Sequence, residues 1–298
     1  MSRNILVLVN KRGGRSMTRR VRRVAGAMMS EASIRHEIVA TRSMRLLRRR
    51  AANASKAGFT EVACAGGDGT VSLVAQALGD TRIPIGVIPC GTGNILAKHL
   101  GIPLLLRPAV RALIDSDRTV AIDAIGHPGG LSILNLSMGV SSLTMADVDS
   151  RMKRVFGTAI YVAGVLLYLV RRNPAHFHLT VDGEEHRFRG REVLLSNAGF
   201  RRTAVETFFS DSDPGDGVME CSVFLAGGLK GAFAMIRDVM RHRTLLEHLY
   251  MVRLKVHDSI VLRSDPPLPI QADGDQIGFG TIEARVRRRE IVVRAPAE

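Results

Sequence analysis

The sequence predicts an α/β domain with a parallel sheet, followed by a second, mostly β domain that forms a sandwich. In the first 120 residues, short apolar runs alternate with segments of helical spacing, which is the order typical of βαβ units. Glycine turns follow three of these runs, and after about residue 122 short β-like runs dominate. We therefore expect two domains, residues 1–122 and residues 123–298.

The first domain is expected to hold four strands and four helices. The strands are predicted at residues 4–9, 35–40, 61–65 and 83–88. The helices are predicted at residues 17–29, 43–57, 70–78 and 94–100. The glycine turns fall at the carboxyl ends of strands, where open α/β sheets bind their ligands.

The second domain is expected to be built mainly from short strands. They are predicted at residues 131–136, 177–182, 186–196, 217–225, 251–256, 259–264 and 290–293. Helical stretches interrupt them at residues 155–170 and 229–240. The first of these helices is nearly apolar, but it is shorter than the roughly 20 residues that a bilayer crossing needs.

Composition and charge narrow the class of protein. The three cysteines are far apart in the chain, and the first ten residues read as a strand rather than a secretory signal, so we expect a cytoplasmic protein. The net charge is +14, and residues 1–50 hold fourteen lysines and arginines against two glutamates. This local basicity indicates an anionic partner, for which nucleic acid, nucleotide phosphates and an acidic membrane all remain open.

The strongest motif is GGDGT at residues 66–70, between a strand and a helix. Gly66, Gly67 and Gly69 allow a ligand to approach the backbone closely, and consecutive amides ahead of the helix that starts near Thr70 form an anion site. Asp68 would repel a phosphate, so we expect it to hold Mg²⁺, a water or the turn itself. The alternative is a tight turn that binds nothing.

A second turn, PCGTGN at residues 89–94, has the same setting. The amides of the turn and the Thr92 hydroxyl are available to phosphate or ribose oxygens. By itself this turn could equally be a capped helix start. Its position shortly after the first motif favours a shared ligand.

Together the two motifs resemble the catalytic domain of diacylglycerol and sphingosine-type lipid kinases, especially the soluble bacterial members. The resemblance covers nearly the whole chain. It implies a nucleotide-binding α/β domain followed by a lipid-substrate sandwich domain, with the active site in the cleft between them. It also implies that ATP is held by Asn10, Thr41, Gly66, Gly67, Asp68, Gly69, Thr70, Gly91, Thr92 and Asn94. Lys11 stands where the family has a proline, and Asn135 matches a family Asn-x-x-x-Gly pattern.

Two acidic clusters acquire roles from this resemblance. In the first, Asp213, Asp216 and the Val218 carbonyl would bind a structural Mg²⁺, a cation that prefers oxygen ligands. The alternative is a solvated acidic turn. In the second, Asp273-Gly274-Asp275 resembles the family's Asp-Gly-Glu, whose carboxylates activate the acceptor hydroxyl. Either Asp275 or Asp273 could be the base, and the alternative is a plain hairpin turn.

The sequence is thus interpreted as an ATP-dependent, Mg²⁺-requiring lipid kinase. Its substrate could be diacylglycerol, phosphatidylglycerol, ceramide or a sphingoid base. One alternative is a soluble-substrate enzyme of the NAD kinase type, which also uses GGDGT. Another is a catalytically dead, basic protein that binds nucleic acid or membrane. No nucleic acid is expected, because the chain has no Trp and only three Tyr for base stacking.

The basic segment at residues 42–50 offers a means of membrane contact. Arg42, Arg45 and Arg49 are expected on one helix face, with Leu46 and Leu47 toward the body of the domain. Such a face suits anionic lipid headgroups, although it could be merely solvated. We therefore expect peripheral contact with an anionic membrane and leave a homodimer open. The chain lacks a P-loop and a GxGxxG after its first strand, which excludes two common nucleotide sites.

Overall fold

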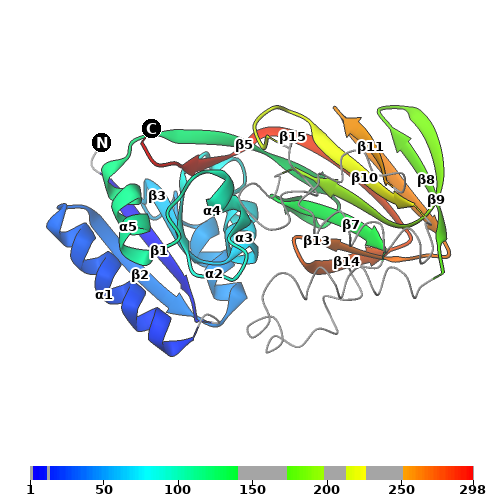
Figure 1. Ribbon diagram of the computed structural model, residues 1–298. Coiled ribbons are helices and arrows are strands. Elements are labelled where there is room, and N and C mark those ends of the chain that lie inside the picture. Colours follow the sequence, from blue (N-terminus) through cyan, green and yellow to red (C-terminus); the bar gives the residue numbers. More distant parts are fainter. Residues whose placement is uncertain (1–2, 12–13, 140–172, 198–212, 226–250, 298) are drawn as a thin grey trace, which may run out of the picture. The chain divides into compact units, whose positions relative to one another are not determined.

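The computed structural model describes residues 3–11, 14–139, 173–197, 213–225 and 251–297 (Figure 1). The chain divides into two compact units, Met1–Asp123 with Arg288–Glu298, and Ala124–Arg287. The helices predicted at residues 155–170 and 229–240 lie outside the described residues. Within the described part of the chain, no helix is long and apolar enough to cross a membrane.

The first unit is built on a parallel sheet. Its strands are β1 (Asn4–Asn10), β2 (Arg35–Thr41), β3 (Glu61–Gly66) and β4 (Ile85–Pro89), in the order β4-β3-β1-β2. Strand β3 is buried along its whole length, and so is the interior of β1. Continuous burial of this kind is typical of parallel strands covered on both faces.

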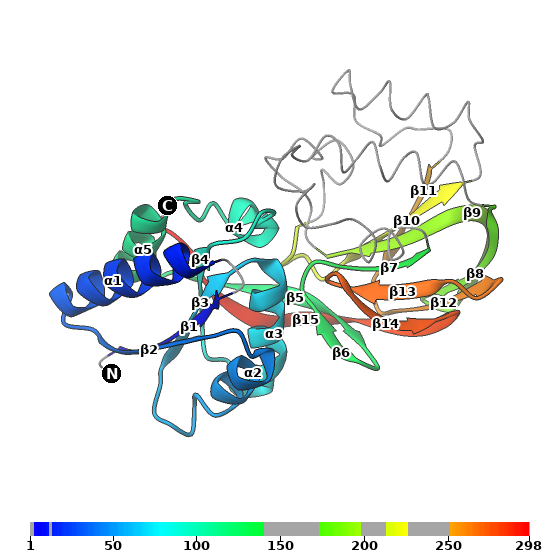
Figure 2. The same cartoon turned by 90° about the horizontal axis from the view of Figure 1, so that it is seen from below.

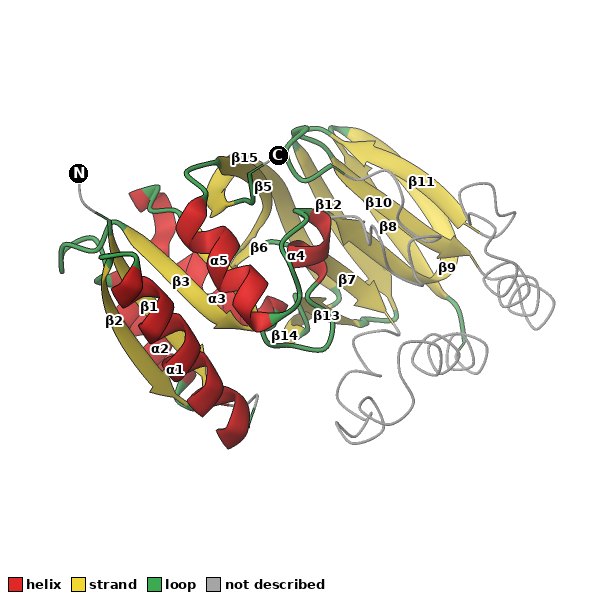
Figure 3. Ribbon diagram, turned by 60° about the vertical axis from the view of Figure 1, so that its left-hand side comes forward, coloured by secondary structure: helices red, strands yellow, loops and turns green. Residues whose placement is uncertain are grey.

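Helices cover both faces of this sheet (Figures 2 and 3). On one face, α1 (Arg15–Glu31) and α5 (Leu106–Asp115) pack over a core that includes Ile5, Val7 and Val9 of β1. On the other face lie α2 (Met44–Ala52) and α3 (Asp68–Leu78), which pack against each other. The short helix α4 (Ile95–His99) follows β4, and a 3₁₀ turn, η2 (Gly79–Thr81), follows α3.

All eight elements predicted for this domain are present, with shifted ends. The largest shift concerns the helix expected at residues 43–57, which ends at Ala52 because residues 53–58 form tight turns closed by bonds such as that from the Ala57 N–H to the Asn53 carbonyl. Strand β4 begins at Ile85 rather than at residue 83. Helix α5 was not among the predicted elements.

The end of the chain returns to the first unit, which corrects the predicted boundary of the second domain. Strand β15 (Thr281–Arg294) is much longer than the strand expected at residues 290–293, and it runs from the second unit into the first. Val293 pairs in parallel with Ile85 of β4, and Arg294 forms an ion pair with Glu61 of β3. These contacts place residues 288–298 in the first unit instead of in a domain 123–298.

The second unit is mostly β, as expected. Strand β5 (Thr119–His127) enters it from the first unit, and the strands that follow are β6 (Gly130–Ser132), β7 (Asn135–Gly139), β8 (Ala175–Val181), β9 (Glu184–Ser196), β10 (Met219–Leu225), β11 (Met251–Val256), β12 (Ser259–Asp265), β13 (Pro269–Ala272) and β14 (Asp275–Phe279). Their pairings within the unit are antiparallel. In β8, Phe177 and Leu179 face the core while His176 and His178 are exposed, which is the period of a strand buried on one side.

The strand predicted at residues 131–136 differs from the structure. The run at residues 131–136 is not one strand but two, β6 and β7, interrupted at Ile133 and Leu134. The interruption has a physical cause, since the amides there bond to the Asp273 carboxylate rather than to a neighbouring strand. The hairpin of β13 and β14 was foreseen only as the turn between them.

Candidate functional site

Most of the predicted nucleotide residues gather at one edge of the first unit. Because the strands are parallel, their carboxyl ends meet at the same edge. Asn10 at the end of β1 lies in register with Thr41 at the end of β2, and Gly66 of β3 pairs with Pro89 of β4. The two glycine turns therefore start side by side.

The first turn, GGDGT, is tightly packed. A Cβ on Gly66 would lie 2.6 Å from the Thr70 hydroxyl oxygen, so only glycine fits there. Thr70 is buried, and its hydroxyl accepts a 2.9 Å hydrogen bond from the Asn10 side-chain amide. The structure thus brings together two residues, Asn10 and Thr70, that the sequence placed 60 positions apart.

The second turn is closed by one of its own side chains. The Asn94 carboxamide accepts a 3.0 Å hydrogen bond from the Gly91 N–H and donates a 2.8 Å bond to the Gly91 carbonyl. Asn94 itself has a positive φ of 47°, a conformation that asparagine tolerates better than most residues. Asn94 therefore shapes the loop, while Thr92 is exposed at its tip.

Asp68 joins the two turns. It is the first residue of α3, and its carboxylate accepts a 3.2 Å hydrogen bond from the Leu96 N–H in the first turn of α4. Burial raises the pKa of this carboxyl above its ordinary value, although the amides of Ile95 and Leu96 and the charge of Lys98 oppose the change. Of the three roles expected for Asp68, holding the turn is the one that the structure shows.

The first turn is accessible to solvent at Gly69. Gly69 is exposed, and a Cβ there would meet nothing within 4 Å. It lies at the N-terminus of the 11-residue helix α3, where the helix dipole favours an anion. Thr41 lies at the same edge, and its hydroxyl accepts a 3.0 Å hydrogen bond from the Ser43 N–H just ahead of α2.

The second unit carries the Asp-Gly-Asp motif at the hairpin of β13 and β14. Asp273 and Gly274 both have positive φ, 48° and 93°, as a two-residue type I′ hairpin requires. The hairpin alternative is thus confirmed, and it coexists with a further role. One Asp273 carboxylate oxygen accepts the Leu134 and Asn135 N–H groups at 3.0 Å each, and the other accepts the Ile133 N–H at 2.8 Å.

The two aspartates of this motif therefore differ in what they can do. Asp273 uses both carboxylate oxygens on backbone donors, and its own N–H donates to the Asn135 carbonyl at 3.0 Å. Asp275 begins β14 and is exposed. The sequence could not distinguish these two carboxylates, because the three amides that engage Asp273 come from a segment about 140 positions away.

The acidic turn at residues 213–218 has oxygen donors but is held by its own backbone. The Asp213 carboxylate accepts the Gly215 N–H at 3.0 Å, and the Asp216 carboxylate accepts the Val218 N–H at 2.9 Å. Asp213 and Asp216 are both exposed. Two carboxylates with adjoining carbonyls suit a hard cation such as Mg²⁺, although no group of three acidic, His or Cys side chains gathers around a common point among the described residues.

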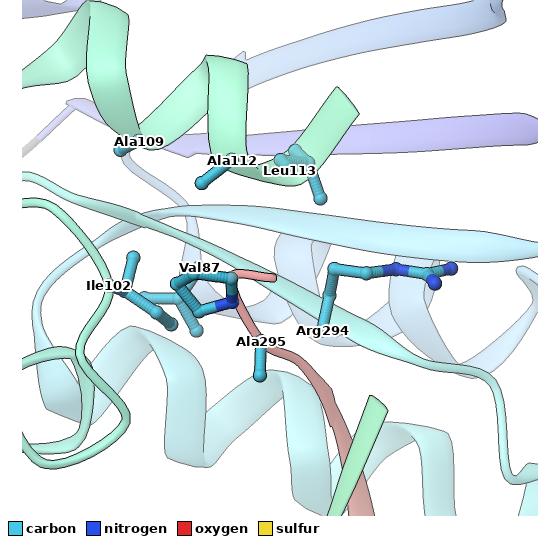
Figure 4. Close-up of a pocket in the computed structure, with 8 residues that line it drawn as sticks. Val87, Ile102, Ala109, Ala112, Leu113, Arg294 and Ala295 are labelled. Carbon is cyan, nitrogen blue, oxygen red and sulfur yellow. The ribbon is translucent and has the colours of Figure 1, made fainter. Parts of the chain in front are cut away.

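Neither the cavity of the first unit nor the thiol of Cys90 is suited to catalysis. A small cavity is lined mainly by apolar side chains, including Val87, Ile102 and Leu113 (Figure 4). It contains none of the predicted site residues. The Cys90 thiol lies in the second turn, but burial raises its pKa to about 11, so it stays protonated and is a poor nucleophile.

Sequence reasoning missed several groups that shape these sites. The N–H groups of Leu96 and of residues 133–135 are backbone donors, and the type of a residue does not indicate that its backbone N–H binds a distant side chain. Met44 places its sulfur 3.7 Å from the Asn10 side-chain amide, again across a long separation in the chain. Leu46 was expected to face the body of the domain, but it is 40% exposed while Leu47 is fully buried.

Comparison with known proteins agrees with this architecture. Residues 4–125 match the model of the diacylglycerol kinase catalytic domain, and residues 135–294 match that of the YegS C-terminal NAD kinase beta sandwich-like domain. A protein of Pseudomonas savastanoi named "Probable lipid kinase YegS-like" is 26% identical over 84% of this chain and 81% of its own length. A diacylglycerol kinase of Mycobacterium tuberculosis is 35% identical, over 43% of each chain.

A solved structure shares the fold. The crystal structure of a diacylglycerol kinase from Bacillus anthracis superposes with a TM-score of 0.78 at 17% identity. The match covers 98% of this chain and 96% of the other. Both predicted architectures, the α/β unit and the β-sandwich unit, are therefore confirmed.

Proposed function

Because the chain belongs to the kinase family that joins a diacylglycerol kinase catalytic domain to a YegS C-terminal sandwich domain, we propose that it transfers the γ-phosphate of ATP to a lipid hydroxyl. Membership of this family makes the protein a kinase. The lipid acceptor, the nucleotide residues and the metal are the parts that we propose.

The observation that carries the proposal is the contact between the two glycine turns. A Cβ on Gly67 would lie 3.1 Å from the Gly91 α-carbon, so the turns meet backbone to backbone. Together they form a surface without bulky side chains at the N-terminus of α3. Such a surface lets a triphosphate approach the amides closely, and the helix dipole favours its charge.

We assign the role of proton acceptor to Asp275. In the transfer, the lipid hydroxyl oxygen bonds to the γ-phosphorus, the bond from that phosphorus to the bridging oxygen breaks, and ADP leaves with the electron pair. The hydroxyl proton passes to a carboxylate. Asp275 is exposed and free to receive it, whereas Asp273 already accepts three amide hydrogen bonds and positions the hairpin.

Magnesium has two places in this proposal. ATP would enter as its magnesium complex, and the turn at residues 213–218 would hold a structural ion through Asp213, Asp216 and the Val218 carbonyl. A bound cation supplies neutralisation of negative charge. The proposal also places the enzyme in the cytoplasm, where it meets its lipid at a membrane surface.

Transfer of label from γ-labelled ATP to lipids in detergent micelles tests the proposal. The panel contains diacylglycerol, phosphatidylglycerol, ceramide and a sphingoid base, with NAD as a soluble acceptor. We expect label in one or more lipids and none in NAD. Label in NAD alone would establish the NAD kinase alternative, which the name of the matched sandwich domain makes worth testing. No label in any acceptor would contradict a kinase role for this chain.

Variants of the Asp-Gly-Asp motif test the assigned base. Asp275→Asn should lower the transfer rate by about 10²- to 10⁴-fold without loss of stability. Asp258→Asn, at an exposed carboxylate of the same unit, is the matched control and should keep the rate. If Asp275→Asn keeps the full rate while a folded Asp273→Asn loses it, the assignment is wrong.

A further inference from the structure

Exposed leucines gather on the first unit. Among the described residues, four large hydrophobic side chains are exposed: Leu46 at 40%, Leu104 at 46%, Leu105 at 73% and Phe279 at 63%. Three of them belong to the first unit. Leu104 and Leu105 are consecutive and lie in the short link between α4 and α5. Contiguous exposed apolar side chains are typical of an interaction surface.

The direction of α5 places Leu104 and Leu105 at the edge that carries the glycine turns. The last turn of α5 lies at the opposite edge, because the Leu113 and Ile114 carbonyls both accept hydrogen bonds from the Arg3 guanidinium ahead of β1. The ten residues of α5 span about 15 Å, which is close to the length of the strands beneath. The helix therefore starts at the carboxyl edge of the sheet.

Leu46 lies at the same edge on the other face of the sheet. The carboxyl end of β2 leads through Thr41 and Ser43 directly into α2. The Leu46 N–H is bonded to the Ser43 hydroxyl, so Leu46 is in the first turn of that helix. The exposed leucines thus flank the glycine turns on both sides of one edge.

Basic side chains accompany these leucines. Arg45 precedes Leu46, Arg107 follows Leu105 by two positions, and Arg15 begins α1 at the same edge. All three are exposed, and within the described part of the chain none forms an ion pair with an acidic side chain. By contrast, Arg50 of α2 pairs with Glu37 and Arg111 of α5 with Asp115.

We propose that this edge docks on an anionic lipid bilayer, with Leu104 and Leu105 entering the interface and the arginines contacting headgroups. We call it the docking edge, and it comprises Arg15, Arg45, Leu46, Leu104, Leu105 and Arg107. Apolar side chains within a rim of uncompensated positive charge match a surface that is negative outside and apolar beneath. The inference rests on the proposed lipid substrate, and it would bring the glycine turns close to the surface that holds that substrate.

A single tryptophan reports on this docking directly, because the chain has none of its own. Leu105→Trp should show a blue-shifted emission with vesicles of phosphatidylglycerol and phosphatidylcholine, and quenching by brominated lipids. Phe279→Trp, at a site in the second unit that is 63% exposed, is the control and should show neither effect. If Leu105→Trp does not respond while sedimentation shows the protein bound to vesicles, another surface docks and the proposal fails.

Charge variants test the role of the arginines in vesicle binding. Arg107→Gln and Arg45→Gln should each weaken vesicle binding about fivefold at low salt. Arg35→Gln is their control, because Arg35 is exposed at the start of β2, the opposite edge of the same sheet. Equal weakening by all three would show that only net charge matters and would overturn the docking edge. An equal blue shift of Leu105→Trp with duplex DNA would overturn the choice of a bilayer.

These binding measurements need no ATP, so they can fail independently of the proposed function. Leu104→Ser with Leu105→Ser should reduce vesicle binding about tenfold or more. The same double variant should keep its transfer rate in detergent micelles, where the acceptor is dispersed. Vesicle binding without any transfer would contradict the kinase proposal alone, whereas transfer in micelles without vesicle binding would contradict the docking edge alone.

Discussion

A Cβ placed on Gly91 would lie 2.5 Å from the α-carbon of Gly67. The two glycines belong to different turns, which follow the neighbouring strands β3 and β4. Their contact makes the two turns one surface, and it leaves no room for a side chain at Gly91 and little at Gly67. The requirement for glycine here comes from packing between loops, in addition to any contact with a ligand.

Gly91→Ala should therefore separate the turns. The added methyl group must displace backbone, which we expect to cost about 1–3 kcal/mol of unfolding free energy and to weaken ATP binding by more than tenfold. Gly26→Ala in α1 is the control, because a Cβ there meets Ile38 at an ordinary 3.5 Å and alanine favours a helix. Urea denaturation and titration calorimetry with magnesium ATP measure the two effects. Unchanged affinity in Gly91→Ala would contradict a shared nucleotide surface.

Asp68 should make the protein less stable as the pH rises. Its folded pKa is raised above 3.8 by burial, so between these two values the native state binds more protons than the unfolded state. The free energy of unfolding therefore falls as pH increases through that window. Asp68→Asn removes this loss and keeps an oxygen for the Leu96 amide. We expect the advantage of the variant over the parent protein in unfolding free energy to grow as the pH rises above 3.8 toward neutrality.

Urea denaturation across that range measures the gain, and Asp115→Asn, at an exposed carboxylate of α5, is the control. A stability difference between Asp68→Asn and the parent protein that does not change with pH would show that burial of the carboxylate has no energetic consequence. Loss of kinase activity in the more stable variant would show that the buried charge is retained for function.

Asp273 should matter for folding more than Asp275. Asp273→Ala leaves three backbone amides without their acceptor, which we expect to cost about 2–4 kcal/mol. Asp275→Ala removes only an exposed side chain and should change the unfolding free energy by less than about 0.5 kcal/mol. Chemical denaturation followed by circular dichroism compares them. Equal losses of stability would refute the division of roles between the two aspartates.

The ion pairs of Glu61 should hold the end of the chain in the first unit. Glu61 is 1% exposed, and its carboxylate lies 2.8 Å from the Arg3 guanidinium and 2.9 Å from that of Arg294. Glu61→Ala leaves two cations facing each other in a buried place, at a cost of about 3–5 kcal/mol. Glu37→Ala breaks only the exposed pair with Arg50 and should cost at most about 1 kcal/mol. Thermal denaturation should show a large fall in Tm for the first variant alone.

Local patterns in the sequence were enough to predict several parts of this protein. Alternating apolar runs and helical segments predicted every strand from β1 to β4, because each element is specified by neighbouring residues. Glycine turns after β3 and β4 predicted, for the same reason, the edge at which we propose that the nucleotide binds, since strand ends in a parallel sheet must meet. The hairpin turn at Asp273-Gly274 could likewise be predicted, because Asp-Gly is one of the few residue pairs that readily adopt two consecutive positive φ angles.

The folded structure was needed for every feature that depends on residues far apart in the chain. It assigned Asp273 to the amides of residues 133–135, and so left Asp275 as the free carboxylate of an otherwise ambiguous pair. It also returned residues 288–298 to the first unit through Glu61 and β4, and it turned Leu46 outward. The sequence does not show which backbone amides bind a distant carboxylate, and the exposure of a side chain depends on which distant elements pack against it. These features therefore became visible only once the chain was folded.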